Sequence, residues 1–313
     1  RFIFITGDGG NGKTRLLNEI YHRYSGIAQV NFTQILDFDD PVLHLTENIK
    51  LRIAEQLDIE QFQSYFQKHS DYYKIQGIDE VSHEQLKQLK EELEKDFIKN
   101  FNIISHNQRV VLRFDTTDAL QDRSEALKDF LRLSINFKNM LVIIAGRDAD
   151  KFTAFFTEKP RKYVIKTINI ASFSTDMSLE YLRKKQEIVP MPSLDDDLEK
   201  KLIFLSGGKP ILLDMAVMWR MQGIELPWMS QYHAEEIRGV SDNEKDGFRL
   251  EFEKELVSPI IETTDNLYKF FILAAWVYPL EPTILSILLE IPPDETERVL
   301  KEAQAYVFIK QLP

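Results

Sequence analysis

Short runs of consecutive apolar residues alternate with longer segments in which apolar positions recur every three or four residues. The apolar runs are rich in β-branched and aromatic side chains, which is typical of strands buried in a sheet. They cover residues 2–5, 28–32, 109–114, 140–146 and 163–170. The segments between them have the periodicity of helices. Strands that alternate with helices predict an α/β fold with a mainly parallel sheet, covered by helices on both faces.

The helical segments of the first half include one that begins at Lys13 and others at residues 43–57 and 124–137. Residues 58 to about 107 are polar and rich in helical patterns, and we interpret them as a helical insertion. An apolar stripe in this insertion either packs on the domain or binds a partner. The stripe consists of Leu86, Leu89, Leu93 and Phe97.

From Ser174 onward the pattern is helical almost throughout. Helices are expected at residues 174–185, 193–208, 209–219, 264–278, 281–291 and 294–305, followed by a strand at 306–313. Ser174 and Ser193 are suited to cap the first two helices. Residues 222–243 mix Gly, Pro, Ser and charges, which favours a linker. Three short helices followed by a strand are typical of the beginning of a winged-helix domain.

A chain of 313 residues is too long for one ordinary core, so several domains are expected. We expect an α/β domain over residues 1–172, interrupted by the helical insertion. A helical lid domain with its linker is expected over 173–243. A winged-helix domain, incomplete at its C-terminal end, is expected over 244–313. The first residue already begins a strand, which indicates an internal fragment.

The stretch GDGGNGKT at residues 7–14 has the spacing G-x-x-x-x-G-K-[ST], and it stands between an apolar strand and a helix. That context is the one this phosphate-binding motif requires. Its glycines let the backbone wrap a phosphate with N–H groups pointing inward. Lys13 can neutralise β- and γ-phosphates, and the Thr14 hydroxyl can bind Mg²⁺. The alternative is a glycine-rich turn with an accidental Lys-Thr. The residues expected to bind nucleotide here are Gly7, Asp8, Gly9, Gly10, Asn11, Gly12, Lys13, Thr14 and Arg15.

Two acids follow the apolar run 109–114. Asp115 stands where that strand ends, and ligands of an open parallel sheet bind at the carboxyl ends of its strands. Asp115 is therefore expected to hold Mg²⁺ beside the phosphate loop. Asp118 is the candidate for orienting or deprotonating the attacking water. Alternatively, Asp118 caps the following turn.

Arg147 ends the next apolar run and can reach a γ-phosphate, which would report whether that phosphate is present. The alternative is a surface arginine paired with Asp148 or Asp150. Further on, two glycines and Pro210 stand at a helix start. By themselves they are ordinary helix punctuation, because glycine ends helices and proline fits a first turn.

Composition narrows the function. Lys and Arg total 39 against 50 Asp and Glu, and the net charge of −11 disfavours broad nucleic-acid binding. The absence of cysteine excludes disulfides and thiol zinc sites and suits a reducing cytosol. No apolar run reaches about 18 residues, so no transmembrane helix is expected. The histidines lack paired metal-ligand spacing, and no nucleophile elbow is present.

Together these motifs resemble the STAND class of P-loop NTPases, which are the NB-ARC and NACHT-like signalling ATPases of bacterial regulators and of plant and animal immune receptors. GDGGNGKT resembles the first motif of that class, and FDTTD resembles its second. AGRD resembles its strand-end arginine, called sensor 1. GGKP resembles the GLP motif, whose proline lies against the adenine, so the resemblance assigns Pro210 to nucleotide binding. It covers nearly the whole chain.

The resemblance implies an AAA+-like parallel sheet followed by a helical domain and a winged helix. It implies a switch that binds ADP or ATP with Mg²⁺ and hydrolyses ATP slowly. ADP would hold it closed and monomeric; ATP would open it and allow homo-oligomerisation. Effector and sensor domains would lie outside this sequence, in a cytoplasmic bacterial defence or signalling protein. Two features depart from the family: the second acid follows Asp115 by three residues, and the winged-helix histidine of relatives would lie after Pro313.

Two other classes compete with this interpretation. An AAA+ ATPase of the replication-initiator type also joins a P-loop module to a winged helix, which binds DNA there. The expected recognition helix at 294–305 is too acidic for a DNA groove. A P-loop kinase or other small-molecule transferase would need an acceptor pocket and has no evident place for the long helical tail. The sequence therefore favours a nucleotide switch without nucleic-acid or membrane partners.

Overall fold

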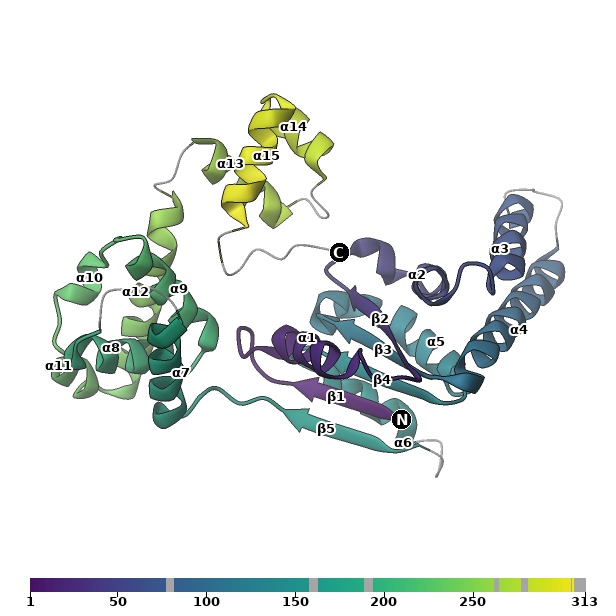
Figure 1. The fold of residues 1–313 in the computed structure, drawn as a ribbon, viewed down its shortest axis with the longest axis horizontal. Coiled ribbons are helices and arrows are strands. Elements are labelled where there is room, and N and C mark those ends of the chain that lie inside the picture. The colour runs from purple at the N-terminus through teal and green to yellow at the C-terminus, as the bar shows by residue number, and fades with distance from the viewer. Residues whose placement is uncertain are drawn as a thin grey trace. The chain divides into compact units, whose positions relative to one another are not determined.

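The computed structural model describes residues 1–76, 82–157, 163–188, 194–261, 265–276, 281–304 and 306. It divides into two compact units (Figure 1). The first consists of Arg1–Gly7 and Lys13–Ile170, and the second of Asp8–Gly12 and Ala171–Pro313. The separation of the second unit into a lid and a winged helix stays a prediction.

The first unit is built on a five-stranded parallel sheet in the order β2-β3-β4-β1-β5. The strands are β1 (Phe2–Thr6), β2 (Val30–Asp37), β3 (Arg109–Asp115), β4 (Met140–Ala145) and β5 (Ile165–Asn169). This confirms the predicted fold class. The prediction for β2, residues 28–32, was wrong at both ends, because the register shifts between Phe32 and Ile35 and the bulge breaks the regular alternation of the strand.

Nine helical segments, four of them very short, complete the described part of the first unit. They are α1 (Lys13–Tyr24), η1 (Pro41–His44), α2 (Thr46–Leu57), α3 (Gln63–Gln76), α4 (His83–Asn107), η2 (Thr117–Arg123), α5 (Glu125–Ser134), η3 (Ala149–Thr153) and α6 (Ala154–Thr157). The helix expected at 43–57 is divided at Leu45, whose backbone is extended. The expected insertion is the pair α3 and α4.

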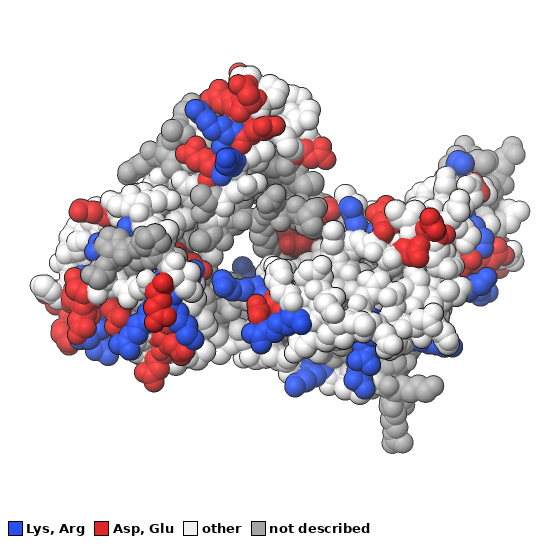
Figure 2. All heavy atoms as spheres, in the orientation of Figure 1, with Lys and Arg blue, Asp and Glu red and all other residues white. Residues whose placement is uncertain are grey.

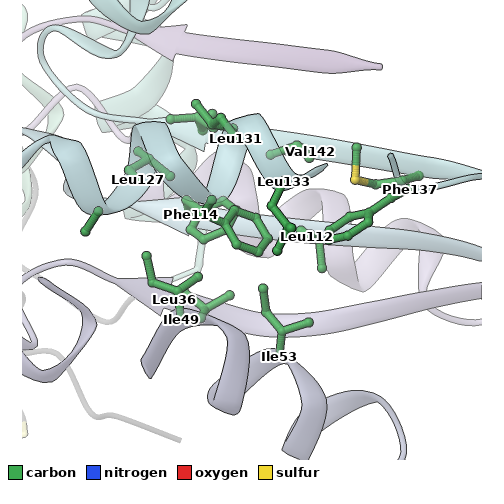
Figure 3. Close-up of a cluster of buried hydrophobic side chains, with 14 of the residues drawn as sticks. Leu36, Ile49, Ile53, Leu112, Phe114, Leu127, Leu131, Leu133, Phe137 and Val142 are labelled. Atoms are coloured by element: carbon green, nitrogen blue, oxygen red, sulfur yellow. The ribbon is translucent and has the colours of Figure 1, made fainter. Parts of the chain in front are cut away.

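Alternate residues of the strands face opposite sides of the sheet and fill two cores. On one side, Phe4, Leu112 and Val142 pack with residues of α2, α4 and α5 (Figure 3). On the other side, Ile5 and Ile143 pack with α1. Helices thus cover both faces, as predicted. Half of the α4 stripe packs on the domain: Leu93 and Phe97 are buried in the first of these cores, whereas Leu86 and Leu89 are only partly buried and are not among its residues.

The described part of the second unit is entirely helical. Its helices are α7 (Thr175–Ile188), α8 (Asp196–Ser206), α9 (Pro210–Met221), α10 (Pro227–Ser230), α11 (Ala234–Arg238), α12 (Asp242–Ile261), α13 (Asp265–Trp276), α14 (Pro282–Leu289) and α15 (Pro293–Ala303). The predicted linker at 222–243 was wrong, since α10 and α11 form there. Helix α12 was not predicted, because Gly247 and Pro259 interrupt its helical pattern.

Ser174 accepts a hydrogen bond from the Met177 N–H at 3.2 Å and caps α7, as predicted. The cap of α8 is Asp195. The predicted cap Ser193 lies outside the described residues, and so does the strand expected at 306–313 except for Tyr306. Trp219 is fully buried in the core of this unit, and its indole Nε1 donates to the Leu256 carbonyl at 2.7 Å.

Two further observations concern the charge and the hydrophobicity of the chain. Acidic and basic side chains are interspersed over α7, α8 and α11 on the face shown in Figure 2. Within the part of the chain that the structure describes, no helix is both long and apolar enough to cross a bilayer.

Candidate functional site

The loop between β1 and α1 depends on glycine for its shape. Gly7, Gly10 and Gly12 have φ values of 139°, 82° and 91°, a region that L-residues rarely adopt. A Cβ on Gly7 would lie 2.3 Å from the Ile170 carbonyl oxygen, so no larger residue fits there. At Gly12 nothing lies within 4 Å of such a Cβ, and the requirement is conformational. The G-x-x-x-x-G spacing therefore encodes a backbone conformation.

Lys13 and Thr14 form the first turn of α1. The Lys13 Nζ donates to the Gly7 carbonyl at 2.7 Å, which folds the ammonium back over the loop. The Thr14 hydroxyl donates to Asp115 Oδ2 at 2.5 Å, across 101 positions of sequence. Arg15, the next residue, is exposed. The structure thus brings the predicted phosphate lysine, the predicted metal hydroxyl and the predicted metal carboxylate to one edge of the sheet.

Asp115 ends β3 and is almost completely buried. Its Oδ1 accepts from the Thr116 N–H at 2.9 Å, and Thr116 turns the chain sharply with a φ of 54°. Asp37 pairs in register with Asp115 from the neighbouring strand β2 and is also buried. Asp37 was not predicted as a site residue, although the acids of ILDFDD follow an apolar run in the sequence.

Asp118 and Arg147 follow neighbouring strands and contact each other. Asp118 Oδ1 accepts from the Arg147 backbone N–H at 3.0 Å, and its Oδ2 lies 3.4 Å from Arg147 Nε. Asp118 is not the cap of its turn, since Thr116 occupies that position. Arg147 is 66% exposed and has an acidic partner, but this partner is neither Asp148 nor Asp150. The two predicted catalytic residues form one ion pair.

Gly146 was also missed and allows this pair to form. A Cβ on Gly146 would lie 2.1 Å from Thr117 Oγ1 and 3.2 Å from Asp118 Oδ1. Any side chain at this position would push apart the segments that follow β3 and β4. The glycine of AGRD is therefore required by close packing between two strand ends.

Arg113 holds the phosphate-loop helix against the sheet from inside. Its Nε and Nη2 donate to the Thr33 carbonyl at 3.0 and 2.6 Å, and its Nη1 donates to the Leu17 carbonyl of α1 at 3.3 Å. The guanidinium lies 4.6 Å from the centre of the Tyr21 ring. Burial lowers the pKa of Arg113 to about 10, so it remains charged at neutral pH. The bulge in β2 leaves the Thr33 carbonyl available for this contact.

The GGKP segment lies in the second unit. Gly207 ends α8 with a φ of 58°, and Pro210 is the first residue of α9. The Gly208 carbonyl accepts from the Phe173 N–H at 2.8 Å, and a Cβ on Gly208 would lie 2.2 Å from the Phe173 carbonyl oxygen. Helix punctuation accounts for these residues. The contact of Pro210 with an adenine stays a prediction.

The oxygen atoms at the end of β3 fit a magnesium ion. Mg²⁺ prefers oxygen ligands and commonly combines one or two protein oxygens with phosphates and waters. The Thr14 hydroxyl and the Asp115 carboxylate, joined by their hydrogen bond, supply such a pair next to Lys13.

The glycine loop and the sheet together define the class of protein as that of the P-loop α/β fold. Its parallel sheet has the order β2-β3-β4-β1-β5 and is followed by a helical region.

Comparisons with known proteins find similarity only to solved structures of low sequence identity. No protein-family model and no curated protein matches the chain. It is similar to the Walker-type ATPase of Pyrococcus abyssi, with 15% identity over 99% of this chain and 86% of that chain, and a TM-score of 0.47. For Drosophila ORC bound to DNA the identity is 14%, the coverage 100% and 64%, and the TM-score 0.41. For Aeropyrum pernix ORC2 in its ADP form these values are 14%, 97% and 79%, and 0.43.

Proposed function

We propose that the chain is an adenine-nucleotide switch of the STAND class, which binds ADP or ATP with Mg²⁺ and hydrolyses ATP slowly. The observation that carries the nucleotide site is the hydrogen bond from Thr14 to Asp115, because it joins the glycine loop to the end of β3. The order of the four motifs along the sequence supports the STAND class in particular. The same resemblance supports homo-oligomerisation, effector and sensor domains outside this sequence, and a cytoplasmic role in bacterial defence or signalling.

Each site residue has a defined task in this proposal. Lys13 moves from the Gly7 carbonyl to the β- and γ-phosphates, and the N–H groups of the loop and of the start of α1 bind the same oxygens. Thr14 and Asp115 hold the metal, which neutralises charge that develops on the phosphates. Asp118 accepts a hydrogen bond from the attacking water and orients it.

The ion pair between Asp118 and Arg147 supports slow, regulated turnover. While Arg147 contacts Asp118, the carboxylate is partly occupied and the guanidinium is not directed at a phosphate. A γ-phosphate competes with Asp118 for Arg147, which frees Asp118 to orient water. Binding of ATP and assembly of the hydrolytic site are thereby coupled, as is typical of nucleotide switches.

The first experiment is to denature the purified protein and identify the nucleotide that it releases. ADP or ATP supports the proposal. A guanine nucleotide, or no nucleotide together with no binding of added ADP, contradicts it. Size measurements with Mg·ADP and with a non-hydrolysable ATP analogue then test the switch, for which a larger species is expected only with the analogue.

Rates of ATP hydrolysis in single variants distinguish the roles of the site residues. Asp115→Asn should lower the rate of ATP hydrolysis by about 10- to 100-fold, the range found when support for a metal is lost. Asp150→Asn is the matched control, because this substitution removes the same charge from an exposed position on η3. Equal rates in Asp115→Asn and the wild type would remove Asp115 from the metal site. Arg147→Ala should reduce the preference for ATP over ADP.

A DNA-binding experiment tests the alternative that the chain is an ATPase of the replication-initiator type. In α15, Arg298 already pairs with Glu295, and Asp294, Glu297 and Glu302 add negative charge. Such a helix is poorly suited to a DNA groove. Salt-dependent binding of a DNA duplex that Arg298→Gln and Lys301→Gln abolish would favour the initiator type over the switch.

A further inference from the structure

A pocket of about 220 Å³ opens within the second unit between α7, α8, α11 and α12. All the residues that line it belong to this unit, and none of them is acidic. The basic ones are Lys200 of α8, Arg238 of α11 and Arg249 of α12. The lining of this pocket thus carries three positive charges and no acid, although the chain as a whole has a net charge of −11.

The acids nearest to these cations leave the positive charge largely uncompensated. Lys200 lies 3.7 Å from Asp196, whose side chain is 95% exposed. Arg249 Nη1 lies 3.7 Å from Asp246, which is also exposed. Within the described residues no carboxylate lies within ion-pair distance of Arg238. Long ion pairs in water are weak, so the pocket attracts anions.

A buried hydroxyl in the wall supplies independent support for a ligand. Ser178 of α7 is completely buried, lines the pocket, and its Oγ has no hydrogen-bond partner among the described residues. The Arg249 Nε is also buried without a partner. Buried polar atoms of native proteins are nearly always hydrogen-bonded, and the exceptions often mark a site for a ligand or ion. Both atoms can donate, which suits an acceptor-rich ligand.

The start of α7 adds to this arrangement. Thr175, the first residue of this 14-residue helix, lines the pocket together with Ser178. The start of a helix carries partial positive charge, which favours phosphate. In α7 the Met177 N–H is already bound by the Ser174 hydroxyl, so this charge is what the helix start contributes to the site. The anion would therefore be held by a helix N-terminus, a serine hydroxyl and arginines, which are common ligands of phosphate oxygens.

The rest of the wall consists of apolar side chains and of Gly207 and Gly208. Phe173, Ile203 and Phe204 line the pocket, and the Arg249 guanidinium lies 6.0 Å from the centre of the Phe204 ring. An inorganic ion would leave these side chains without a partner. A ligand with an apolar or aromatic group next to its phosphate would cover them and gain from the hydrophobic effect.

We propose that this pocket binds a small organic phosphate monoester, with the phosphate at Ser178, Arg238 and Arg249 and the organic group against Phe173 and Phe204. No residue of the phosphate loop lines this pocket. The proposal does not depend on the proposed switch function.

The test is a calorimetric titration with phenyl phosphate of the full chain carrying Lys13→Ala, which disables the phosphate loop. We expect saturable binding with a Kd of about 1 mM or lower, and tighter binding than that of inorganic phosphate. Arg238→Gln and Arg249→Gln should each weaken it by about tenfold, the usual effect of losing a charged hydrogen bond. Lys184→Gln is the matched control, because it removes an exposed charge from α7 outside the pocket.

Ser178→Ala separates a ligand role from a structural one. It should weaken binding of phenyl phosphate several-fold while leaving the melting temperature without ligand unchanged or higher, since the hydroxyl has no partner in the fold. The proposal is overturned if Lys13→Ala abolishes binding, if Arg238→Gln and Lys184→Gln behave alike, or if no saturation occurs up to about 10 mM. Tighter binding of inorganic phosphate than of phenyl phosphate would overturn the organic part.

Discussion

The phosphate loop between β1 and α1 and the basic pocket between the helices of the second unit both gather donors for an anion, but they are built differently. In the loop, one continuous stretch of sequence supplies the glycines, Lys13 and Thr14, and a strand end adds Asp115. In the pocket, four helices supply one or a few residues each. The donors of the first site follow one sequence motif, whereas the three cations of the second belong to none, although Gly207 and Gly208 of GGKP also line the pocket.

The supporting structures differ in the same way. The loop follows β1 in a parallel sheet whose central strands β1, β3 and β4 are buried on both faces, and Arg113 holds α1 against that sheet from within. The pocket stands on helix packing, with Trp219 as the largest buried side chain. A site on strand ends is fixed by the ladder of the sheet, whereas a site between helices follows side-chain packing. The predictions below test this contrast.

The largest effect on stability is expected from Phe114, a core residue of β3 that directly precedes Asp115. Phe114→Ala should destabilise the protein by about 3–5 kcal/mol, because Phe114 is fully buried against Phe38 and Phe130 at ring distances of 5.8 and 5.5 Å. Urea unfolding measures it, with the exposed Ile103→Ala as control. A loss below about 1 kcal/mol would show that the site does not depend on a tightly packed core.

Lys13→Ala should remove the stabilisation that nucleotide provides and leave the ligand-free stability nearly unchanged. At a nucleotide concentration one hundred times the Kd, the wild type gains about 2.7 kcal/mol. Melting curves with and without Mg·ADP measure this, and Lys166→Ala, an exposed lysine on β5, is the control. The same ADP shift in both variants would mean that the nucleotide binds elsewhere.

Substitutions of Arg113 test how α1 is held against the sheet. Arg113→Lys should destabilise the protein by about 2 kcal/mol, since lysine retains a buried charge but cannot reach both carbonyls with a planar fork. Arg113→Met should be less harmful, because it removes that charge. Chemical denaturation of the two variants checks the order. If methionine were the worse of the two, the hydrogen bonds to Thr33 and Leu17 would outweigh the burial of charge.

Trp219→Phe is the corresponding change in the second unit. It keeps an aromatic ring but loses the hydrogen bond to the Leu256 carbonyl, and a loss of about 1 kcal/mol is expected. Hydrogen exchange of α9 and α12 locates the effect. An effect as large as that of Phe114→Ala would contradict the contrast between the two cores.

The smallest effect concerns pH. Burial lowers the pKa of His69 on α3, near Glu47 and Lys50 of α2 and beside Tyr65 and Tyr73. The unfolded chain therefore takes up the proton first, and stability falls as the pH drops through the ordinary histidine pKa towards the lowered one. His69→Gln should flatten this part of the pH profile of the melting temperature. An unchanged profile would assign the acid sensitivity to other groups.

The helix-rich second half shows how sequence patterns can mislead. Residues 222–243 contain turn formers and mixed charge, yet α10 and α11 form there because Met229 of α10 and Ala234 and Ile237 of α11 are buried. In α12, Phe248, Phe252, Leu256 and Ile260 recur at four-residue spacing, but Gly247 and Pro259 hide the pattern. Tertiary burial overrides local propensity in both segments.

The sequence by itself determined the parallel α/β fold, the position of the glycine loop and the placement of Asp115 at a strand end, because apolar runs and positive-φ glycines are local requirements. Only the tertiary structure decided that Asp37 pairs with Asp115, that Asp118 pairs with Arg147, and that Arg113 is a buried anchor. The basic pocket of the second unit belongs to the same group. These contacts join residues from separate strands and helices, and their geometry is set by packing that no single segment encodes.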